Sequence, residues 1–303
     1  MHFLVTILGS GSALPTENRG PTSQYVECNG RHILIDCGEG TQVQIRKYGI
    51  KLQRIEHILI SHLHGDHYFG LVGLLSSMHL LGRVKPINIY GPEGLKEIVE
   101  LQLHYGHSRL AYELNFHTLD ANSNACFFED DIFSLHHFPL SHKVPTIGYL
   151  IQEKERERNL RTEIAIADGV KVEYMHRLKK GVDVVADDGT VLSFEKYTKA
   201  PKKPRSYAFC SDTKYYEAVI PFIQNASTLY HEATFTEAFI DRAKSTFHST
   251  AIQAASIAKK AQVGKLLMGH LSARYNDGEL HVEEAKTVFE NCEVVEDGST
   301  YFV

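Results

Sequence analysis

Short apolar runs alternate with longer segments of helical periodicity along most of the chain. This alternation predicts strands covered by helices. In the first half, strands are predicted near residues 3–8, 23–28, 32–36, 55–60 and 87–90, and helices near 40–49, 67–81 and 93–106. In the second half, strands are predicted near 132–138, 146–151, 207–211, 227–231 and 265–269, and helices near 214–223, 250–261 and 281–291. The pattern alone fits either a four-layer αββα sandwich or a doubly wound sheet.

Residues 151–205 interrupt this pattern with little apolar periodicity. Their one local signal is a hairpin, in which residues 181–185 and 190–194 flank a turn at 187–189. The segment carries 13 Lys/Arg against 10 Asp/Glu, whereas the rest of the chain carries 19 against 27. Such charge is often a solvated surface, and phosphate binding is the functional alternative. The segment is therefore predicted to be an insertion.

Composition narrows the class of protein. The length of 303 residues allows one large α/β domain with an insertion as readily as two domains. The net charge of −5 argues against a uniformly basic nucleic-acid binder. The five cysteines are scattered without CxxC spacing, which predicts reduced thiols in the cytoplasm and no cysteine zinc site. Residues 2–8 are strand-like, so neither a signal peptide nor a membrane anchor is expected at the start.

The most informative run is Ser61-His62-Leu63-His64-Gly65-Asp66-His67, which directly follows a predicted strand. Three imidazoles and one carboxylate in so short a run can hold two metal ions. His62 and His64 can face one ion while Asp66 and His67 face the other. These donors suit zinc, with manganese or iron as substitutes.

This run resembles the HxHxDH signature of the metallo-β-lactamase superfamily, and the chain as a whole resembles the ribonuclease Z family. Further landmarks are residues 8–13, 34–41, Ser141-His142, 211–213, His231-Glu232-Ala233-Thr234, His248-Ser249-Thr250 and 269–275. The resemblance implies an α/β fold, the four-layer αββα metallo-β-lactamase sandwich, with residues 1–303 as one domain. It also implies that residues 151–205 are an inserted arm, a candidate tRNA-binding exosite.

The resemblance implies the remaining ligands and the catalytic groups. His142 would join the first ion, His270 the second, and Asp212 would bridge the two zinc ions that we expect per chain. The seven implied ligands are His62, His64, Asp66, His67, His142, Asp212 and His270.

Two such ions activate a hydroxide for attack on a phosphodiester. Asp66 is also the candidate for holding or deprotonating that water, and His248 resembles the family's proton donor to the departing ribose oxygen. Glu232 would orient His248. Asp36 is predicted to brace the metal loops by hydrogen bonds.

The implied activity is that of a zinc-dependent endoribonuclease that cleaves the 3′ trailer from precursor tRNA, leaving a 3′ hydroxyl on the tRNA and a 5′ phosphate on the trailer. A cytoplasmic homodimer is expected. The alternative is a phosphodiesterase that acts on small phosphodiesters or other nucleic acids with the same di-metal site. The family loop PxKxRN, which monitors the 3′ end of tRNA, here reads Pro15-Thr16-Glu17-Asn18-Arg19-Gly20, so the response to CCA-containing precursors stays open. The arm also lacks the Gly-Pro-rich signature of bacterial members.

Overall fold

The computed structural model describes residues 2–303, which divide into two compact units. The first unit runs to Gln152 and resumes at Arg205, and we call it the body. The second unit is Glu153–Pro204, and we call it the arm. None of the described helices is long and apolar enough to cross a membrane.

The first sheet of the body has seven strands, in the spatial order β18, β1, β2, β3, β4, β5 and β6. In that order, their bounds are Thr300–Phe302, Phe3–Gly9, Ser23–Cys28, Arg31–Ile35, His57–Leu59, Ile87–Gly91 and Leu114–Thr118. Pairing is antiparallel from β18 to β3 and parallel from β3 to β6. The helical segments of this half are α1 (Thr41–Lys47), a 3₁₀ turn at Leu52–Arg54, α2 (Gly65–Tyr68), α3 (Leu71–Leu80) and α4 (Leu95–Tyr105).

The second sheet also has seven strands, in the order β17, β16, β15, β14, β9, β8 and β7. In that order, their bounds are Cys292–Val294, Leu266–Gly269, Thr228–Glu232, Ser206–Cys210, Ile147–Glu153, Phe133–Pro139 and Ala125–Glu129. Strands β14 to β17 are parallel, while β14 pairs with β9, and β8 with β7, in antiparallel fashion. Its helices are α8 (Ile220–Ile223), α9 (Ile240–Thr246), α10 (Ala251–Lys260) and α11 (Glu279–Lys286), with 3₁₀ turns at Glu217–Val219 and Glu237–Phe239.

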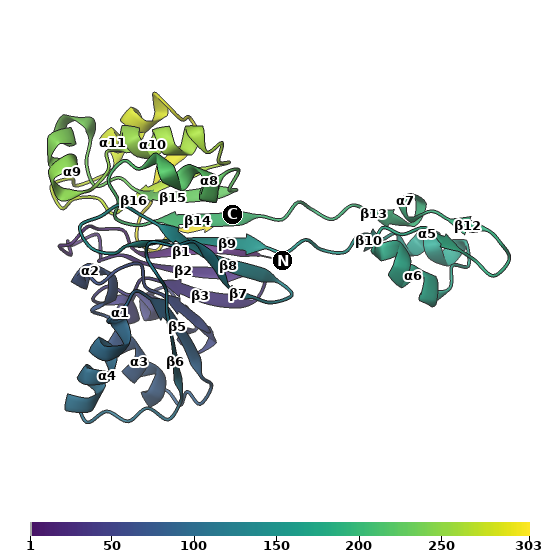
Figure 1. Cartoon of the computed structure of the whole chain (residues 1–303), viewed down its shortest axis with the longest axis horizontal. Coiled ribbons are helices and arrows are strands. Elements are labelled where there is room, and N and C mark those ends of the chain that lie inside the picture. The colour runs from purple at the N-terminus through teal and green to yellow at the C-terminus, as the bar shows by residue number, and fades with distance from the viewer. Residues whose placement is uncertain (1) are drawn as a thin grey trace. The chain divides into compact units, whose positions relative to one another are not determined.

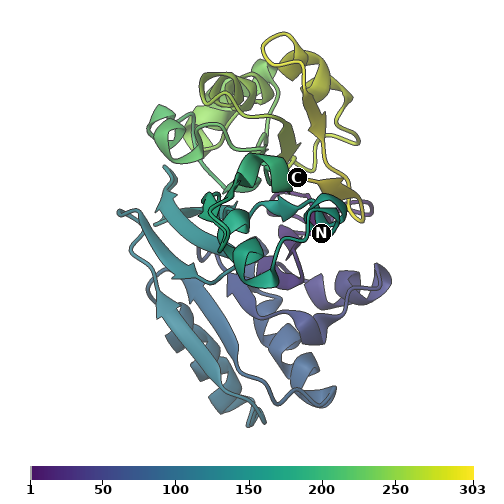
Figure 2. The ribbon, with the colours of Figure 1, turned by 90° about the vertical axis from the view of Figure 1, so that its right-hand side faces the viewer.

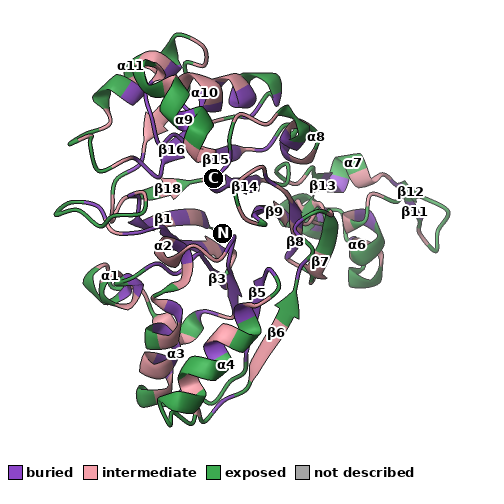
Figure 3. Ribbon diagram, turned by 60° about the vertical axis from the view of Figure 1, so that its left-hand side comes forward, coloured by how far each residue is buried: buried purple, intermediate pink, exposed green. Residues whose placement is uncertain are grey.

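Three clusters of buried apolar side chains separate four layers of the body. Alternate residues of both sheets, such as Val5 and Phe209, share the central cluster, because side chains of a strand point to opposite faces in turn. The outer face of the first sheet packs on α1, α3 and α4, and that of the second sheet packs on α10. The expected αββα sandwich is therefore confirmed. Figure 1 shows the helices of the body outside the two sheets. Figure 2 shows the N-terminal half of the body in purple to blue and the C-terminal helices in green to yellow. Figure 3 shows buried strands between helices with exposed surfaces.

Three predicted helices of the body differ from the structure. The helix predicted over 281–291 is shifted, because α11 spans Glu279–Lys286. The helix predicted over 214–223 is wrong, because only Ile220–Ile223 is α-helical, after a 3₁₀ turn. Pro221 lies in the first turn of α8, and a proline without an N–H cannot continue a helix that began earlier. The helix predicted over 67–81 is interrupted between α2 and α3.

The arm has its own secondary structure and its own small core. Its elements are β10 (Asn159–Leu160), α5 (Thr162–Ala167), α6 (Val172–Lys179), β11 (Val184–Val185), β12 (Val191–Leu192), α7 (Phe194–Tyr197) and β13 (Thr198–Lys199). The predicted hairpin is confirmed, since Val184 pairs with Leu192. The sequence analysis missed the three helices. Their buried residues include Ala165, Leu178 and Tyr197, which pack together in one cluster.

Candidate metal centre

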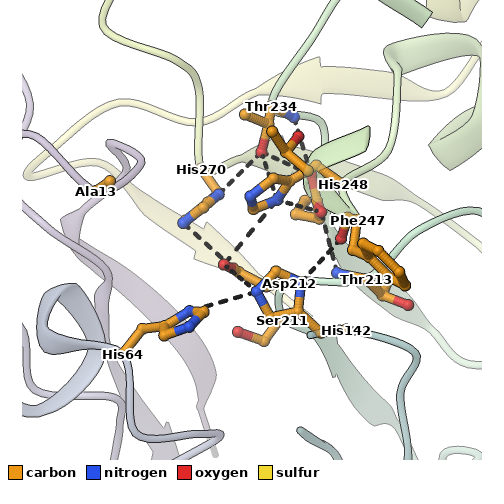
Figure 4. Close-up of polar contacts among 12 residues, drawn as sticks. Ala13, His64, His142, Ser211, Asp212, Thr213, Thr234, Phe247, His248 and His270 are labelled. Atoms are coloured by element: carbon orange, nitrogen blue, oxygen red, sulfur yellow. Dashed lines mark hydrogen bonds and ion pairs between the residues drawn. The ribbon is translucent and has the colours of Figure 1, made fainter. Parts of the chain in front are cut away.

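The candidate ligands lie on loops that follow strands of both sheets. His62 and His64 come after β4, Asp212 after β14 and His270 after β16, where parallel strands end at the same edge. His142 follows β8. Figure 4 shows His64, His142, Asp212 and His270 converging from these separate loops.

Backbone packing holds the histidine run in place. His64 caps α2 in an extended conformation, so that Asp66 falls in the first turn of this helix. The loop after β3 packs directly against it, because the Gly70 N–H donates to the Cys37 carbonyl at 2.9 Å. A Cβ atom on Gly70 would lie 2.1 Å from the carbonyl oxygen of Gly38, so only glycine allows this approach.

The first group of ligand atoms comprises three imidazole nitrogens and one carboxylate oxygen. His64 Nδ1 lies 3.0 Å from His62 Nε2 and 3.3 Å from His142 Nε2. Asp212 Oδ2 lies 3.7 Å from His62 Nε2 and 3.8 Å from His142 Nε2. Ligands at a zinc–nitrogen distance of about 2.1 Å in tetrahedral geometry lie about 3.4 Å apart. The spacing of the four atoms fits one such ion.

The second group has two carboxylate oxygens and two imidazole nitrogens. Asp66 Oδ2 is 3.4 Å from both His67 Nε2 and His270 Nε2. Asp212 Oδ1 is 3.4 Å from His67 Nε2 and 3.2 Å from His270 Nε2. These four distances also fit the edges of a tetrahedral site.

Asp212 belongs to both groups, with Oδ2 toward the first and Oδ1 toward the second. Asp212 Oδ1 and His67 Nε2 are buried and have no hydrogen-bond partner among the described residues. A buried polar atom without a partner costs free energy, and a bound cation between these atoms would remove that cost. The residues present therefore fit two divalent ions that share Asp212.

Hydrogen bonds orient the ligand imidazoles from behind. When one ring nitrogen faces a metal, the other carries the proton and donates it to an acceptor, which fixes the ring. The second nitrogens pair as follows: His62 with Ser61 Oγ at 3.1 Å, His67 with Asp36 Oδ2 at 2.7 Å, His142 with the Phe247 carbonyl at 2.9 Å, and His270 with Thr234 Oγ1 at 2.9 Å. Burial also lowers the pKa of His62 well below its usual value. The neutral imidazole that results is the form that binds metal.

Asp36 braces two loops without entering either ligand group. Its buried carboxylate accepts hydrogen bonds from Ser61 N at 2.7 Å, Ser61 Oγ at 2.8 Å and His67 Nδ1 at 2.7 Å. Burial raises the pKa of this carboxyl. This is the bracing role that the sequence predicted.

Glu232 and His248 form a hydrogen-bonded pair beside the second ligand group. The fully buried Glu232 accepts from His248 Nδ1 at 2.9 Å and from the Thr213 N–H at 3.0 Å. Although burial disfavours its charge, His248 lowers the pKa of Glu232 to about 2. Burial likewise opposes a charge on His248, but the Glu232 carboxylate raises the pKa of His248 to about 9. At neutral pH, the pair is therefore a carboxylate and an imidazolium.

The sequence analysis missed two groups at the centre. Thr234 Oγ1 donates to Glu232 Oε2 at 2.7 Å and lies 3.3 Å from His248 Nδ1, besides its contact with His270. Its place in the His-Glu-Ala-Thr motif was the available signal. The backbone N–H of Ala13 donates to Asp66 Oδ2 at 2.9 Å, and no side-chain pattern could have indicated it.

Comparison with known proteins gives two kinds of match. Residues 3–154 match the family model described as Anti-Pycsar protein Apyc1. A ribonuclease Z from Parabacteroides distasonis is 44% identical over 296 residues, which covers 98% of this chain and 97% of the relative. A ribonuclease Z from Bacteroides fragilis is 42% identical over 289 residues, which covers 95% of each chain.

Solved structures agree with the fold. Human tRNase Z, short form, superposes with a TM-score of 0.72 at 27% identity and covers 98% of both chains. The metallo-beta-lactamase fold protein YhfI from Bacillus subtilis gives a TM-score of 0.71 at 18% identity over 100% of both chains, a likeness of fold alone.

Proposed function

Since the chain belongs to the ribonuclease Z family, we infer that it is a metal-dependent endoribonuclease that cleaves the 3′ trailer from precursor tRNA. The observation that carries this proposal is the position of Asp212, whose two oxygens face two separate groups of ligand atoms. A shared carboxylate can hold two ions close together, and two ions at close spacing can stabilise both the attacking and the leaving oxygen of a phosphodiester. Cleavage would leave a 3′ hydroxyl on the tRNA and a 5′ phosphate on the trailer.

Two zinc ions per chain are the metal content of this proposal, with Mn²⁺ or Fe²⁺ as substitutes. Imidazole and carboxylate donors suit all three metals, and the spacing of the ligand atoms supports two positions. Bound there, the ions would polarise the phosphate and lower the pKa of a water toward neutrality. The proposed ligands are His62, His64 and His142 for one ion, Asp66, His67 and His270 for the other, and Asp212 for both.

Asp66 is the proposed group for holding the attacking water. Although burial opposes its charge, His67 and His270 hold the pKa of the Asp66 carboxyl well below its usual range, so it is ionised at neutral pH. The Ala13 N–H holds Oδ2, and the side chain remains 11% exposed to solvent. An ionised, partly open carboxylate can accept a hydrogen bond or a proton from that water.

His248 is the proposed proton donor to the leaving 3′ oxygen of the tRNA. Its Nδ1 is engaged with Glu232, so in the imidazolium the Nε2–H is the group left to protonate the leaving oxygen. The side chain is 14% exposed, which gives a substrate access to it. Glu232 acts through His248 by orienting and charging it.

The test is a cleavage assay with the full-length protein on a precursor tRNA that carries a 3′ trailer. We expect one cut and a 5′ phosphate on the released trailer. A parallel assay uses a chromogenic phosphodiester. Hydrolysis of the chromogenic compound without any cut in the precursor would favour the alternative, a phosphodiesterase of small substrates. Precursors with and without an encoded CCA test the loop at residues 15–20.

The arm is the proposed contact for the body of the tRNA. Lys199, Lys202 and Lys203 are exposed and make no ion pair within residues 2–303. Unpaired cations release counterions from nucleic acid when they contact phosphates. Replacing Glu153–Pro204 by a short linker should raise the apparent KM for precursor tRNA, while hydrolysis of the chromogenic phosphodiester persists. Equal KM values would refute this role.

A homodimer in the cytoplasm completes the proposal. Val43 on α1 and Leu81 after α3 line one hollow and are 61% and 51% exposed. Exposed apolar side chains that lie together can form part of an interface, and we assign these two to contact with a second copy of the chain. Val43→Lys with Leu81→Lys should give a monomer in sedimentation, whereas Leu101→Lys on α4 should not. A monomeric parent would exclude the dimer.

A further inference from the structure

A hollow of about 550 Å³ is lined in part by the loops that carry the first group of candidate ligands. Leu63, which lies between His62 and His64, lines it on one side. Val144 and Pro145, shortly after His142, line it on another side. Its volume is within the range of clefts that hold small ligands. A ligand in this hollow would therefore contact the same loops that hold His62, His64 and His142.

The lining favours an uncharged, apolar group. Besides Leu63 and Val144, the hollow is lined by Leu119 and Ala121. Its two charged lining residues, Glu93 and Asp120, are acids, and none of the described residues that line it is Lys or Arg. Carboxylates repel a phosphate but accept hydrogen bonds from the edge of a base. The hollow therefore suits a nucleobase and not the backbone of the RNA.

The proposed position of the leaving group indicates whether this base belongs to the tRNA or to the trailer. Figure 4 shows His64 and His248 on opposite sides of Asp212. His248 would protonate the 3′ oxygen of the tRNA, so the tRNA lies on that side of the phosphate. The trailer stays attached to the phosphate through its 5′ oxygen. Because the hollow is lined by Leu63, beside His64 and away from His248, the trailer is the RNA segment that we place there.

We propose that this hollow binds one unpaired base near the 5′ end of the trailer and so contributes to substrate specificity. The inference rests on the proposed function. Unpaired bases are the part of an RNA that proteins read most readily, because their faces and edges are free. The base contact would position the scissile phosphate over the metal centre without taking part in the chemistry.

The experiment is an abasic scan of the trailer. Precursor tRNAs that lack one base at the first, second or third trailer position are cleaved under single-turnover conditions. We expect cleavage efficiency to fall roughly tenfold at one of these positions and little at the others, because a single stacked or buried base contributes an effect of about this size. The intact precursor and the chromogenic phosphodiester serve as references.

A second experiment uses variants whose new side chains fill the hollow. Thr118→Trp and Asn122→Trp each place a large side chain at an exposed lining position, where the fold tolerates it. Each variant should lose roughly tenfold on the intact precursor, and the abasic position should then cost nothing further, because two changes that remove one contact are not additive. Asn124→Trp, exposed in the same loop but outside this hollow, is the matched control.

The outcomes separate this inference from the proposed function. A flat abasic scan with normal cleavage would overturn the inference alone. So would an abasic cost that persists in both filled variants. A parent protein that cuts no precursor tRNA would overturn the proposed function, and the inference with it.

Discussion

The metal centre and the arm differ in how firmly the structure holds their charged groups. At the centre, Glu232 is fully buried and accepts hydrogen bonds from His248, Thr213 and Thr234. In the arm, Lys171 pairs with Asp187 while their side chains are 57% and 72% exposed. Exposed ion pairs contribute little to the free energy of folding, whereas a buried carboxylate without hydrogen-bond partners would destabilise the folded state.

The difference teaches which property each region controls. A preorganised set of buried groups controls the rate of a chemical step, because its geometry need not change during the reaction. Exposed charges control association and its dependence on salt. Substitutions at the centre should therefore change cleavage and metal content, and those in the arm should change affinity.

The largest effect is expected for Asp212→Ala, which removes the one side chain that both ligand groups share. We expect both ions to be lost or weakened and cleavage to fall by roughly a thousandfold or more, since both ions act on the same phosphate. Elemental analysis of the purified variant measures the metal content. Full double occupancy in this variant would refute the bridging role.

The next effect in size is expected for His248→Ala, which should separate chemistry from binding. Metal content and RNA affinity should remain, and single-turnover cleavage should slow by roughly a hundredfold or more, the usual cost of a lost general acid. Asp66→Ala should be slower still, because Asp66 is both a proposed ligand and the proposed holder of the water. Cleavage by His248→Ala at the parental rate would exclude the proton-donor role.

A smaller effect is expected for Thr234→Val, which keeps the shape of the side chain but removes the hydroxyl that contacts Glu232, His248 and His270. Groups that hydrogen-bond to metal ligands and orient them typically change metal affinity or activity by roughly ten- to a hundredfold, so we expect a loss of activity of about that size. The matched control is Thr228→Val, the same change at the far end of β15. An equal loss in both variants would assign the effect to packing of the strand.

The predicted strands show what the apolar pattern can reveal. All ten interior strands of the two sheets were predicted, and the four that were missed, β18, β6, β17 and β7, are the four sheet edges. Interior strands are covered on both sides, so they read as apolar runs. β6 and β7 have no buried residue, and β17 and β18 have three residues each, so their pairing depends on neighbours that the local sequence does not specify.

The metal centre and the arm also differ in how much of each could be predicted from the sequence. His62, His64, Asp66 and His67 could be named because they form one short motif whose spacing is visible in the chain. His142, Asp212 and His270 lie far from it and were named only through the resemblance to the ribonuclease Z family. Ala13 could not, because a backbone N–H leaves no trace in the sequence. The arm helices were missed because they are short and bury few residues each: α5 buries only Ala165 and α6 only Leu178.

The smallest effect is expected in the arm. The test compares arm lysines that form an ion pair with a carboxylate and arm lysines that form none. Replacing Lys199, Lys202 and Lys203 together by Ala removes three exposed cations that make no ion pair within residues 2–303. If each contacts one phosphate, the slope of log affinity for precursor tRNA against log salt should become shallower by about 2 to 3, and affinity at low salt should fall roughly tenfold.

The control replaces the three arm lysines that already face a carboxylate: Lys171 with Asp187, Lys179 with Glu157 and Lys196 with Asp168. Because internal acids offset these charges, their loss should change the salt slope less, although the net charge of the arm changes by the same amount in both variants. Filter binding across a salt series measures both. Equal slopes in the two variants would mean that the arm acts only through its total charge, whereas unchanged slopes in both would mean that it does not contact RNA phosphates.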